Sequence, residues 1–340
     1  MSKNIKFALI GTGRAGLIHG RNFANKVNNA ELIALCDPVV ESLENAQKEL
    51  NCKYTYTDYK ELMKNPEIDA VIIATPTFYH KEIAVEAANE KKHILCEKPL
   101  AMDEQECIDI INATEKNNVK LQVGFMRRFD PSFIEARKAI EDGIIGEVTL
   151  VKSLTHGPSS PKEWMFDISQ SNGPIGEVNS HDLDTLRWLT GSEISSIYSI
   201  GGNFRSPEVK EKYPDFYDTV AMNIEFEDGK LGIIDGAQYV QYGYDARAEI
   251  LGTKGSILIG SQSKHEIKIA TADGKVSQPT MHSWTYLFRD AYQAEAQSFV
   301  DSIINNTEPL ATGHDGLMSV RLVNAGLKSL LENKVIKVDE

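Results

Sequence analysis

The sequence predicts a two-domain α/β protein: a doubly wound parallel sheet, then a C-terminal α+β domain with a large, mainly antiparallel open sheet. Three observations support this prediction. The first third alternates short apolar runs with amphipathic stretches, a glycine-rich turn follows the first run, and the second part changes to β-rich runs with hairpin signals. At 340 residues the chain also exceeds the usual size of a single core.

The first part, residues 1–125, contains short runs rich in Ile, Val and Leu, and helical spacing separates them. The runs cover residues 6–10, 31–36, 69–74, 93–96 and 119–125. Continuous apolar strands between amphipathic helices are typical of a parallel sheet that is covered on both faces. We therefore predict a first, doubly wound domain over residues 1–125 and a second domain over residues 126–340.

The first predicted strand ends in a turn with the pattern G-x-G-x-x-G, Gly11-Thr12-Gly13-Arg14-Ala15-Gly16, which opens a helix. Glycines permit a tight turn, and the exposed N–H groups at the helix start attract a pyrophosphate. The second strand ends in Asp37, whose carboxylate can bind ribose hydroxyls and repels a 2′-phosphate. We expect NAD rather than NADP, with Gly11, Gly13, Arg14, Ala15 and Asp37 at the cofactor.

Two further strand ends provide candidate site residues. The third strand ends near Thr75, Pro76 and His80, a turn that can line the phosphates and the nicotinamide ribose. The fourth ends in Glu97-Lys98-Pro99. A charged pair at the carboxyl end of a buried strand lies where open α/β sheets bind their ligands, so we predict that Lys98 takes part in chemistry and that Glu97 holds it near the cofactor.

The second part contains β-rich runs at residues 148–154, 220–226, 231–237, 248–251 and 257–259, with hairpin signals at Asp228-Gly229 and Asp273-Gly274. Residues 175–189 predict one helix. Its polar face would carry Glu177, His181 and Asp184. A carboxylate beside an imidazole fixes its tautomer and raises its basicity, which prepares a general acid/base.

Composition limits the possible partners. The formal net charge of −13 argues against a nucleic-acid groove, which needs a basic stripe. The four cysteines, at 36, 52, 96 and 107, lack the paired spacing of a zinc or redox site, so no metal is expected. Reduced thiols suit the cytoplasm, and the N-terminal ten residues, interrupted by Lys6, are read neither as a signal peptide nor as a membrane anchor.

Five segments form one combination of motifs: the glycine turn, Glu97-Lys98-Pro99-Leu100, Gln122-Val123-Gly124-Phe125-Met126-Arg127-Arg128-Phe129-Asp130, Gly146-Glu147-Val148 and Ser180-His181-Asp182-Leu183-Asp184. In this combination the chain resembles the glucose-fructose oxidoreductase/inositol dehydrogenase (Gfo/Idh/MocA) family. Within it, Met126-Arg127-Arg128 and Tyr242-Gly243-Tyr244-Asp245 are most similar to inositol 2-dehydrogenases. The resemblance implies a Rossmann domain, a C-terminal α/β domain that often mediates dimers or tetramers, and a cis peptide before Pro99.

The resemblance also implies that Lys98 and His181 are catalytic. One departure is Glu177, which stands where inositol enzymes of the family usually have an aspartate, so that either Glu177 or Asp184 would orient His181. The expected reaction is NAD-linked oxidation of a secondary hydroxyl on a cyclic polyol or sugar. An anhydrosugar such as levoglucosan, a glucoside, or a non-catalytic NAD sensor remain alternatives. Candidates for contact with the substrate, besides Lys98 and His181, are Arg127, Trp164, Gln238, Tyr242 and Asp245.

Overall fold

The computed structural model describes residues 4–264 and 267–338, and the chain divides into two compact units. The first unit comprises the chain up to Asp130 together with Asp290–Val320, and the second comprises Pro131–Arg289 with the residues from Arg321 onward. This division falls after Asp130, whereas the sequence prediction placed the boundary between residues 125 and 126. It also groups residues 290–320, which the prediction placed in the second domain, with the first unit.

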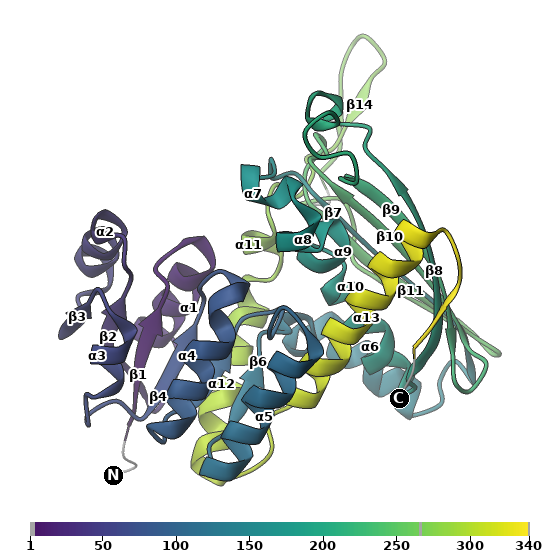
Figure 1. The fold of residues 1–340 in the computed structure, drawn as a ribbon. Coiled ribbons are helices and arrows are strands. Elements are labelled where there is room, and N and C mark those ends of the chain that lie inside the picture. The colour runs from purple at the N-terminus through teal and green to yellow at the C-terminus, as the bar shows by residue number, and fades with distance from the viewer. Residues whose placement is uncertain (1–3, 265–266, 339–340) are drawn as a thin grey trace. The chain divides into compact units, whose positions relative to one another are not determined.

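The first unit is built on a parallel sheet, six strands in the described residues, with the order β3-β2-β1-β4-β5-β6 (Figure 1). This confirms the doubly wound prediction. The strand β3 was not predicted. It has only three residues, Tyr54-Thr55-Tyr56, and the threonine between the two tyrosines leaves no continuous apolar run. The strands are β1 Ile5–Ile10, β2 Ala30–Cys36, β3 Tyr54–Tyr56, β4 Ala70–Ile73, β5 His93–Cys96 and β6 Leu121–Val123.

Helices cover both faces of this sheet, as its buried strands require. In β1, Ala8 and Ile10 belong to one apolar cluster, while Phe7 and Leu9 belong to another that includes Phe299. Phe299 lies on α12 (Arg289–Asn305), which explains why this late segment returns to the first unit. The other helices are α1 Arg14–Asn25, α2 Val40–Leu50, α3 Tyr59–Met63, α4 His80–Asn89 and α5 Glu104–Asn117, with the 3₁₀ turns η1 Thr77–Tyr79 and η2 Met126–Phe129.

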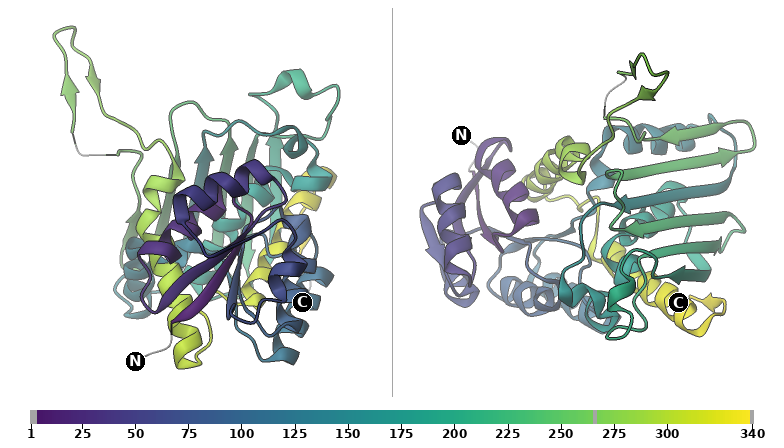
Figure 2. Two further views of the ribbon diagram at one scale, coloured as in Figure 1. Left: turned by 90° about the vertical axis from the view of Figure 1, so that its left-hand side faces the viewer. Right: turned by 90° about the horizontal axis from the view of Figure 1, so that it is seen from above.

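The second unit is built on a mixed sheet, seven strands within the described ranges, in the order β12-β11-β7-β10-β9-β8-β15 (Figure 2). Every neighbouring pair is antiparallel except β7 and β10, so the mainly antiparallel prediction is confirmed. Both predicted hairpins form, between β9 and β10 and between β13 and β14. The strands are β7 Val148–Gly157, β8 Ile194–Gly202, β9 Thr219–Phe226, β10 Leu231–Gln238, β11 Asp245–Gly252, β12 Ser256–Ile259, β13 Ile269–Ala270, β14 Val276–Ser277 and β15 Ile336–Lys337.

The two faces of this sheet differ. Val220, Met222 and Ile224 of β9 are buried on one face, and the residues between them are exposed on the other. Helices cover the buried face, and the hairpin β13–β14 extends away from the sheet (Figure 2). The helices of this unit are α6 Pro131–Glu141, α7 Glu163–Phe166, α8 Ile168–Ser171, α9 Gly173–Glu177, α10 Ser180–Thr190 and α11 Trp284–Leu287, with the 3₁₀ turn η3 Pro207–Val209; α13 Gly313–Glu332 is shared between the units. None of the helices in the described ranges has the length and apolarity to span a membrane.

The prediction of one helix over residues 175–189 is wrong. The structure contains two helices, because α9 ends at Glu177 and α10 begins at Ser180. At the break, the Asn179 N–H bonds to the Pro174 carbonyl oxygen, five residues back, and the Asn179 side chain donates a hydrogen bond of 2.8 Å to Asp182. Glu177 and His181 therefore do not share one helical face.

Candidate functional site

The glycine turn has the local geometry that a dinucleotide requires. Gly11 has a φ of +94°, and a Cβ there would lie 2.5 Å from the Ala74 carbonyl oxygen. A Cβ on Gly16 would lie 1.9 Å from the carbonyl oxygen of Gly11. A Cβ on Gly13 would meet no protein atom within 4 Å, so packing does not explain this glycine. A glycine here leaves the backbone open to the close approach of a ligand.

Asp37 follows β2 and is fixed by the same turn. Its Oδ2 accepts hydrogen bonds from the Thr12 N–H at 2.7 Å and the Thr12 hydroxyl at 2.9 Å, and its Oδ1 accepts one from the Val39 N–H at 2.9 Å. Ser42 Oγ lies 2.8 Å from the Thr12 hydroxyl. Within the described residues Oδ1 accepts only one hydrogen bond and so retains acceptor capacity, and it can hold a ribose hydroxyl without moving.

The turn after β4 contains Thr75, Pro76 and His80. The His80 ring is 1% exposed, and its Nδ1 and Nε2 each lie 2.9 Å from a backbone carbonyl oxygen, of Pro99 and of Thr75. Burial lowers the pKa of His80, although the two carbonyl groups oppose that effect. The ring thus braces the turn after β4 against the loop of Lys98. Thr75 Oγ1 is buried and, among the described residues, has no hydrogen-bond partner, which leaves it available to a ligand.

Lys98 lies at the carboxyl end of β5 and precedes a cis peptide bond to Pro99, as the resemblance implied. Its backbone N–H donates a hydrogen bond of 3.1 Å to Glu97 Oε2. Glu97 Oε1 accepts a hydrogen bond of 2.8 Å from Nε2 of His19, a residue on α1 that is 1% exposed. Both oxygens of Glu97 are thus engaged within the protein, and its carboxylate anchors the loop that presents Lys98.

In the second unit, His181 lies in the first turn of α10 and is 7% exposed. The next residue, Asp182, is fully buried and ties this turn to the sheet. Its carboxylate accepts hydrogen bonds from Ser153 Oγ at 2.5 Å and Thr155 Oγ1 at 3.0 Å, both on β7, and from Asn179 Nδ2 at 2.8 Å. His181 is therefore positioned by its neighbour in the chain. Glu177 is half-buried at the end of α9, and Asp184 is 1% exposed on α10.

Gln238, at the end of β10, lies on the helix-covered face of its sheet. Two residues earlier, a Cβ on Gly236 would lie 2.0 Å from the Asn179 side chain, and residues two apart on a strand share a face. Gln238 Oε1 is buried and has no hydrogen-bond partner within the described residues. Gln238 and His181 therefore belong to the same side of the second sheet.

Tyr242 and Asp245 lie on the opposite, open face. The Tyr242 hydroxyl is hydrogen-bonded to Nδ1 of His156, and His156 is paired in register with Asp245. Asp245 also forms a bidentate ion pair with Arg247, at 2.8 and 3.0 Å, and accepts a hydrogen bond of 2.8 Å from Gln262. The structure thus separates Tyr242 and Asp245 from His181 of the same chain, because alternate residues of a strand point to opposite faces.

The two remaining predicted residues, Arg127 and Trp164, differ in burial and lie in different units. Arg127 lies in η2 of the first unit and is 2% exposed, whereas Trp164 lies in α7 of the second and is 38% exposed. In the described part of the chain, no group of three His, Cys, Asp or Glu side chains is arranged to hold a metal ion. All four cysteines are buried, free thiols.

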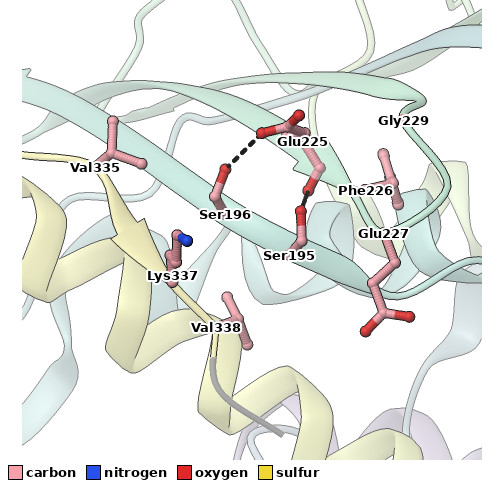
Figure 3. A pocket seen from close by; sticks show the side chains of 9 residues that line it. All are labelled: Ser195, Ser196, Glu225, Phe226, Glu227, Gly229, Val335, Lys337 and Val338. Carbon is pink, nitrogen blue, oxygen red and sulfur yellow. Dashed lines mark hydrogen bonds between the residues drawn. The ribbon is translucent and has the colours of Figure 1, made fainter.

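A surface pocket lies beside β15, and none of the predicted site residues lines it. Its lining includes Ser195, Ser196, Glu225, Val335, Lys337 and Val338 (Figure 3).

Comparison with known families agrees with this geometry. Residues 5–125 match the oxidoreductase family model described as an NAD-binding Rossmann fold, and residues 137–338 match the model of its C-terminal alpha/beta domain. The chain belongs to the Gfo/Idh/MocA family. The Gfo/Idh/MocA models leave out residues 126–136, which contain η2 and the first half of α6.

Relatives within the Gfo/Idh/MocA family match over nearly their whole length. A scyllo-inositol 2-dehydrogenase (NAD(+)) of Bacillus subtilis is 32% identical over 100% of this chain and 98% of its own. A myo-inositol 2-dehydrogenase of Thermotoga maritima is 31% identical over 99% of each chain. The crystal structure of scyllo-inositol dehydrogenase from Lactobacillus casei with bound NAD(H) and scyllo-inositol superposes with a TM-score of 0.89, at 30% identity and 99% coverage of both chains.

The first unit fits the cofactor that this family binds. The open space beside Gly13, the fixed carboxylate of Asp37 and the buried Thr75 hydroxyl provide places for pyrophosphate, ribose hydroxyls and a further polar group. Sequence reasoning did not identify three buried polar residues, His19, Asp182 and Glu295; His19 is bonded to Glu97, and Asp182 is the neighbour of His181 in the chain. A signal existed for Glu295: it interrupts the apolar stripe of α12 that contains Tyr292 and Phe299.

Proposed function

We propose that this protein is an NAD-dependent dehydrogenase that oxidises a secondary hydroxyl of a cyclic polyol of the inositol class. The observation that supports this most is that the chain carries both reacting groups and a dedicated anchor for each: Glu97 holds the loop of Lys98, and Asp182 holds the helical turn of His181. An NAD-binding sensor needs neither pair. The full-length similarity to dehydrogenases named for myo- and scyllo-inositol supports the substrate class.

In the proposed reaction, His181 removes the proton of the substrate hydroxyl. Either Glu177 or Asp184 orients the imidazole. Lys98 donates a hydrogen bond to the same oxygen and stabilises the negative charge that develops as the carbonyl forms. NAD supplies the chemistry that the side chains lack, because its oxidised nicotinamide accepts the hydride from the carbinol carbon. The products are a ketone, reduced cofactor and one proton.

Gln238 and Arg127 are the candidates that we retain for contact with the other hydroxyls of the ring. Gln238 offers a buried amide oxygen on the helix-covered face, and Arg127 is a nearly fully buried guanidinium in η2. A site whose buried polar groups pair with several hydroxyls discriminates against analogues that lack one of them. We therefore expect selectivity for the configuration of the ring hydroxyls.

The test is the formation of reduced nicotinamide by the purified protein. NAD and then NADP are supplied with myo-inositol, scyllo-inositol, levoglucosan and simple glucosides. We expect turnover with NAD and an inositol, since Asp37 disfavours the 2′-phosphate of NADP. Turnover confined to levoglucosan or a glucoside would replace the substrate class. Binding of NAD with no turnover on any sugar would favour the sensor.

Two variants and one control test the roles. Lys98→Met removes the amine and keeps most of the volume, so we expect kcat to fall about 10²–10³-fold with little change in NAD affinity. His181→Ala should lower kcat by about 10²-fold or more. The matched control is Lys48→Met, an exposed lysine on α2, which should change neither quantity. Normal turnover by Lys98→Met would rule out the mechanism.

A further inference from the structure

Behind Lys98 lies a buried group of polar side chains that the proposed reaction does not use. His19 and Glu97 form its hydrogen-bonded pair, and the rings of His19 and of Tyr292 on α12 pack edge to face with 5.4 Å between their centroids. Gln122 of β6 donates a hydrogen bond of 3.1 Å to the backbone carbonyl of Glu295. Glu295 lies one helical turn after Tyr292, so it belongs to the same interior group.

The position of Glu295 is unfavourable for a charge. The residue is 0% exposed, and its neighbours along the buried stripe of α12 are Tyr292, Ala296 and Phe299. Both carboxyl oxygens are buried, and the described residues provide neither with a hydrogen-bond donor. An ionised carboxylate in such a place would lose its hydration without compensation, whereas a carboxylic acid avoids most of that cost.

Glu97 lies in the same interior group but in a different electrostatic environment. Burial alone raises the pKa of Glu97, but the hydrogen bond and charge of His19, together with Lys98, outweigh it and lower the pKa. For Glu295, burial raises the pKa well above its ordinary value, and the charge of Glu97 raises it further. Of the titratable groups in this interior group, Glu97 at the end of β5 acts on Glu295 directly. His19 from α1 and Lys98 act on Glu97, and Tyr292 of α12 contacts His19.

We propose that Glu295 is a positioning residue for Lys98: a carboxylic acid that keeps its proton, so that the two buried glutamates carry one negative charge and Glu97 alone is ionised. Two carboxylates in one buried group repel each other, and the neutral form of Glu295 removes this repulsion. Glu97 then keeps both of its bonds, to His19 and to the Lys98 N–H. This inference rests on the proposed function only for the role of Lys98.

The proposal predicts how the loop responds to alkaline pH. When Glu295 loses its proton, a second anion appears beside Glu97, and the hydrogen bond that holds the Lys98 N–H weakens. Glu295→Gln has the same shape and stays neutral at every pH, so it should keep the loop in place where the wild type loses it. The matched control is Glu308→Gln, which makes the same chemical change at an exposed glutamate.

Two measurements without substrate test the proposal on the full-length protein. Infrared spectroscopy at neutral pH should detect the C=O stretch of a protonated carboxyl in the wild type and in Glu308→Gln, and this band should be absent from Glu295→Gln. Hydrogen exchange should show protection of the Lys98 amide falling about tenfold per pH unit in the wild type relative to Glu295→Gln, once Glu295 titrates. If Glu295→Gln fails to fold, Glu295→Met removes the same band.

The outcomes separate this inference from the proposed function. An infrared band unchanged by substitution of Glu295 would overturn the assignment of the proton. A lost band with equal protection of Lys98 in both proteins at all pH values would overturn the positioning role. Neither measurement requires turnover, so failure of the sugar panel would leave both results interpretable.

Discussion

Replacing Asp182 tests how the turn of His181 is built. The Asp182 carboxylate accepts hydrogen bonds from Ser153, Thr155 and Asn179 at 2.5, 3.0 and 2.8 Å. Asp182→Ala removes this acceptor and leaves the three buried donors without it. A hydrogen bond to a charged group contributes about 1.5–3 kcal/mol, so a simple total exceeds about 4 kcal/mol. The two hydroxyls can rotate and neighbouring effects do not add, so we expect a loss of about 3–5 kcal/mol in the free energy of unfolding.

Urea denaturation at neutral pH, followed by circular dichroism, measures this loss. Asp182→Asn keeps one acceptor oxygen and should lose only about 1–2 kcal/mol. The control, Asp142→Ala, removes an exposed carboxylate after α6 and should stay within about 0.5 kcal/mol of the wild type. Folded Asp182→Asn should also show a reduced kcat with unchanged NAD affinity, because His181 is the preceding residue. A loss below about 1 kcal/mol for Asp182→Ala would refute the anchoring role.

Two other predictions concern the first unit. Gly16→Ala should destabilise the fold, because its Cβ would lie 1.9 Å from the Gly11 carbonyl oxygen. Gly13→Ala should leave the melting temperature unchanged and weaken NAD binding at least about tenfold, as measured by calorimetry. Equal effects of the two substitutions on stability would contradict this prediction. Burial raises the pKa of Asp315, but Arg128, 2.8 Å away, outweighs it and lowers the pKa. The pair therefore stabilises the protein above the ordinary carboxyl pKa, and Asp315→Asn should cost about 3 kcal/mol at neutral pH. This deficit should begin to shrink below about pH 4 and disappear once the pH is below the lowered pKa of Asp315. A deficit independent of pH would contradict the prediction.

The sequence alone determined the fold class, because strand and helix periodicities are local. It also located the glycine turn, Asp37 and Lys98, since in a parallel sheet such residues must follow strand ends. It failed where local pattern and packing conflict. Apolar residues have helical spacing throughout residues 175–189, yet the helix is interrupted between Glu177 and Ser180, where the Asn179 side chain bonds to Asp182.

Tertiary structure decided which residues share a face and which buried carboxyl groups have a raised or a lowered pKa. Gln238 ends β10 and Asp245 begins β11, so the sequence places them close together along the chain. Only the pairing of Asp245 with His156 of β7, and the hydrogen bond between the Tyr242 hydroxyl and His156, show that Tyr242 and Asp245 lie on the other face. Glu97 and Glu295 are the same residue type and lie far apart in the sequence. Folding buries both of them, and the charge of Glu97 then raises the pKa of Glu295. These properties depend on contacts between distant segments, so no local pattern in the sequence could predict them.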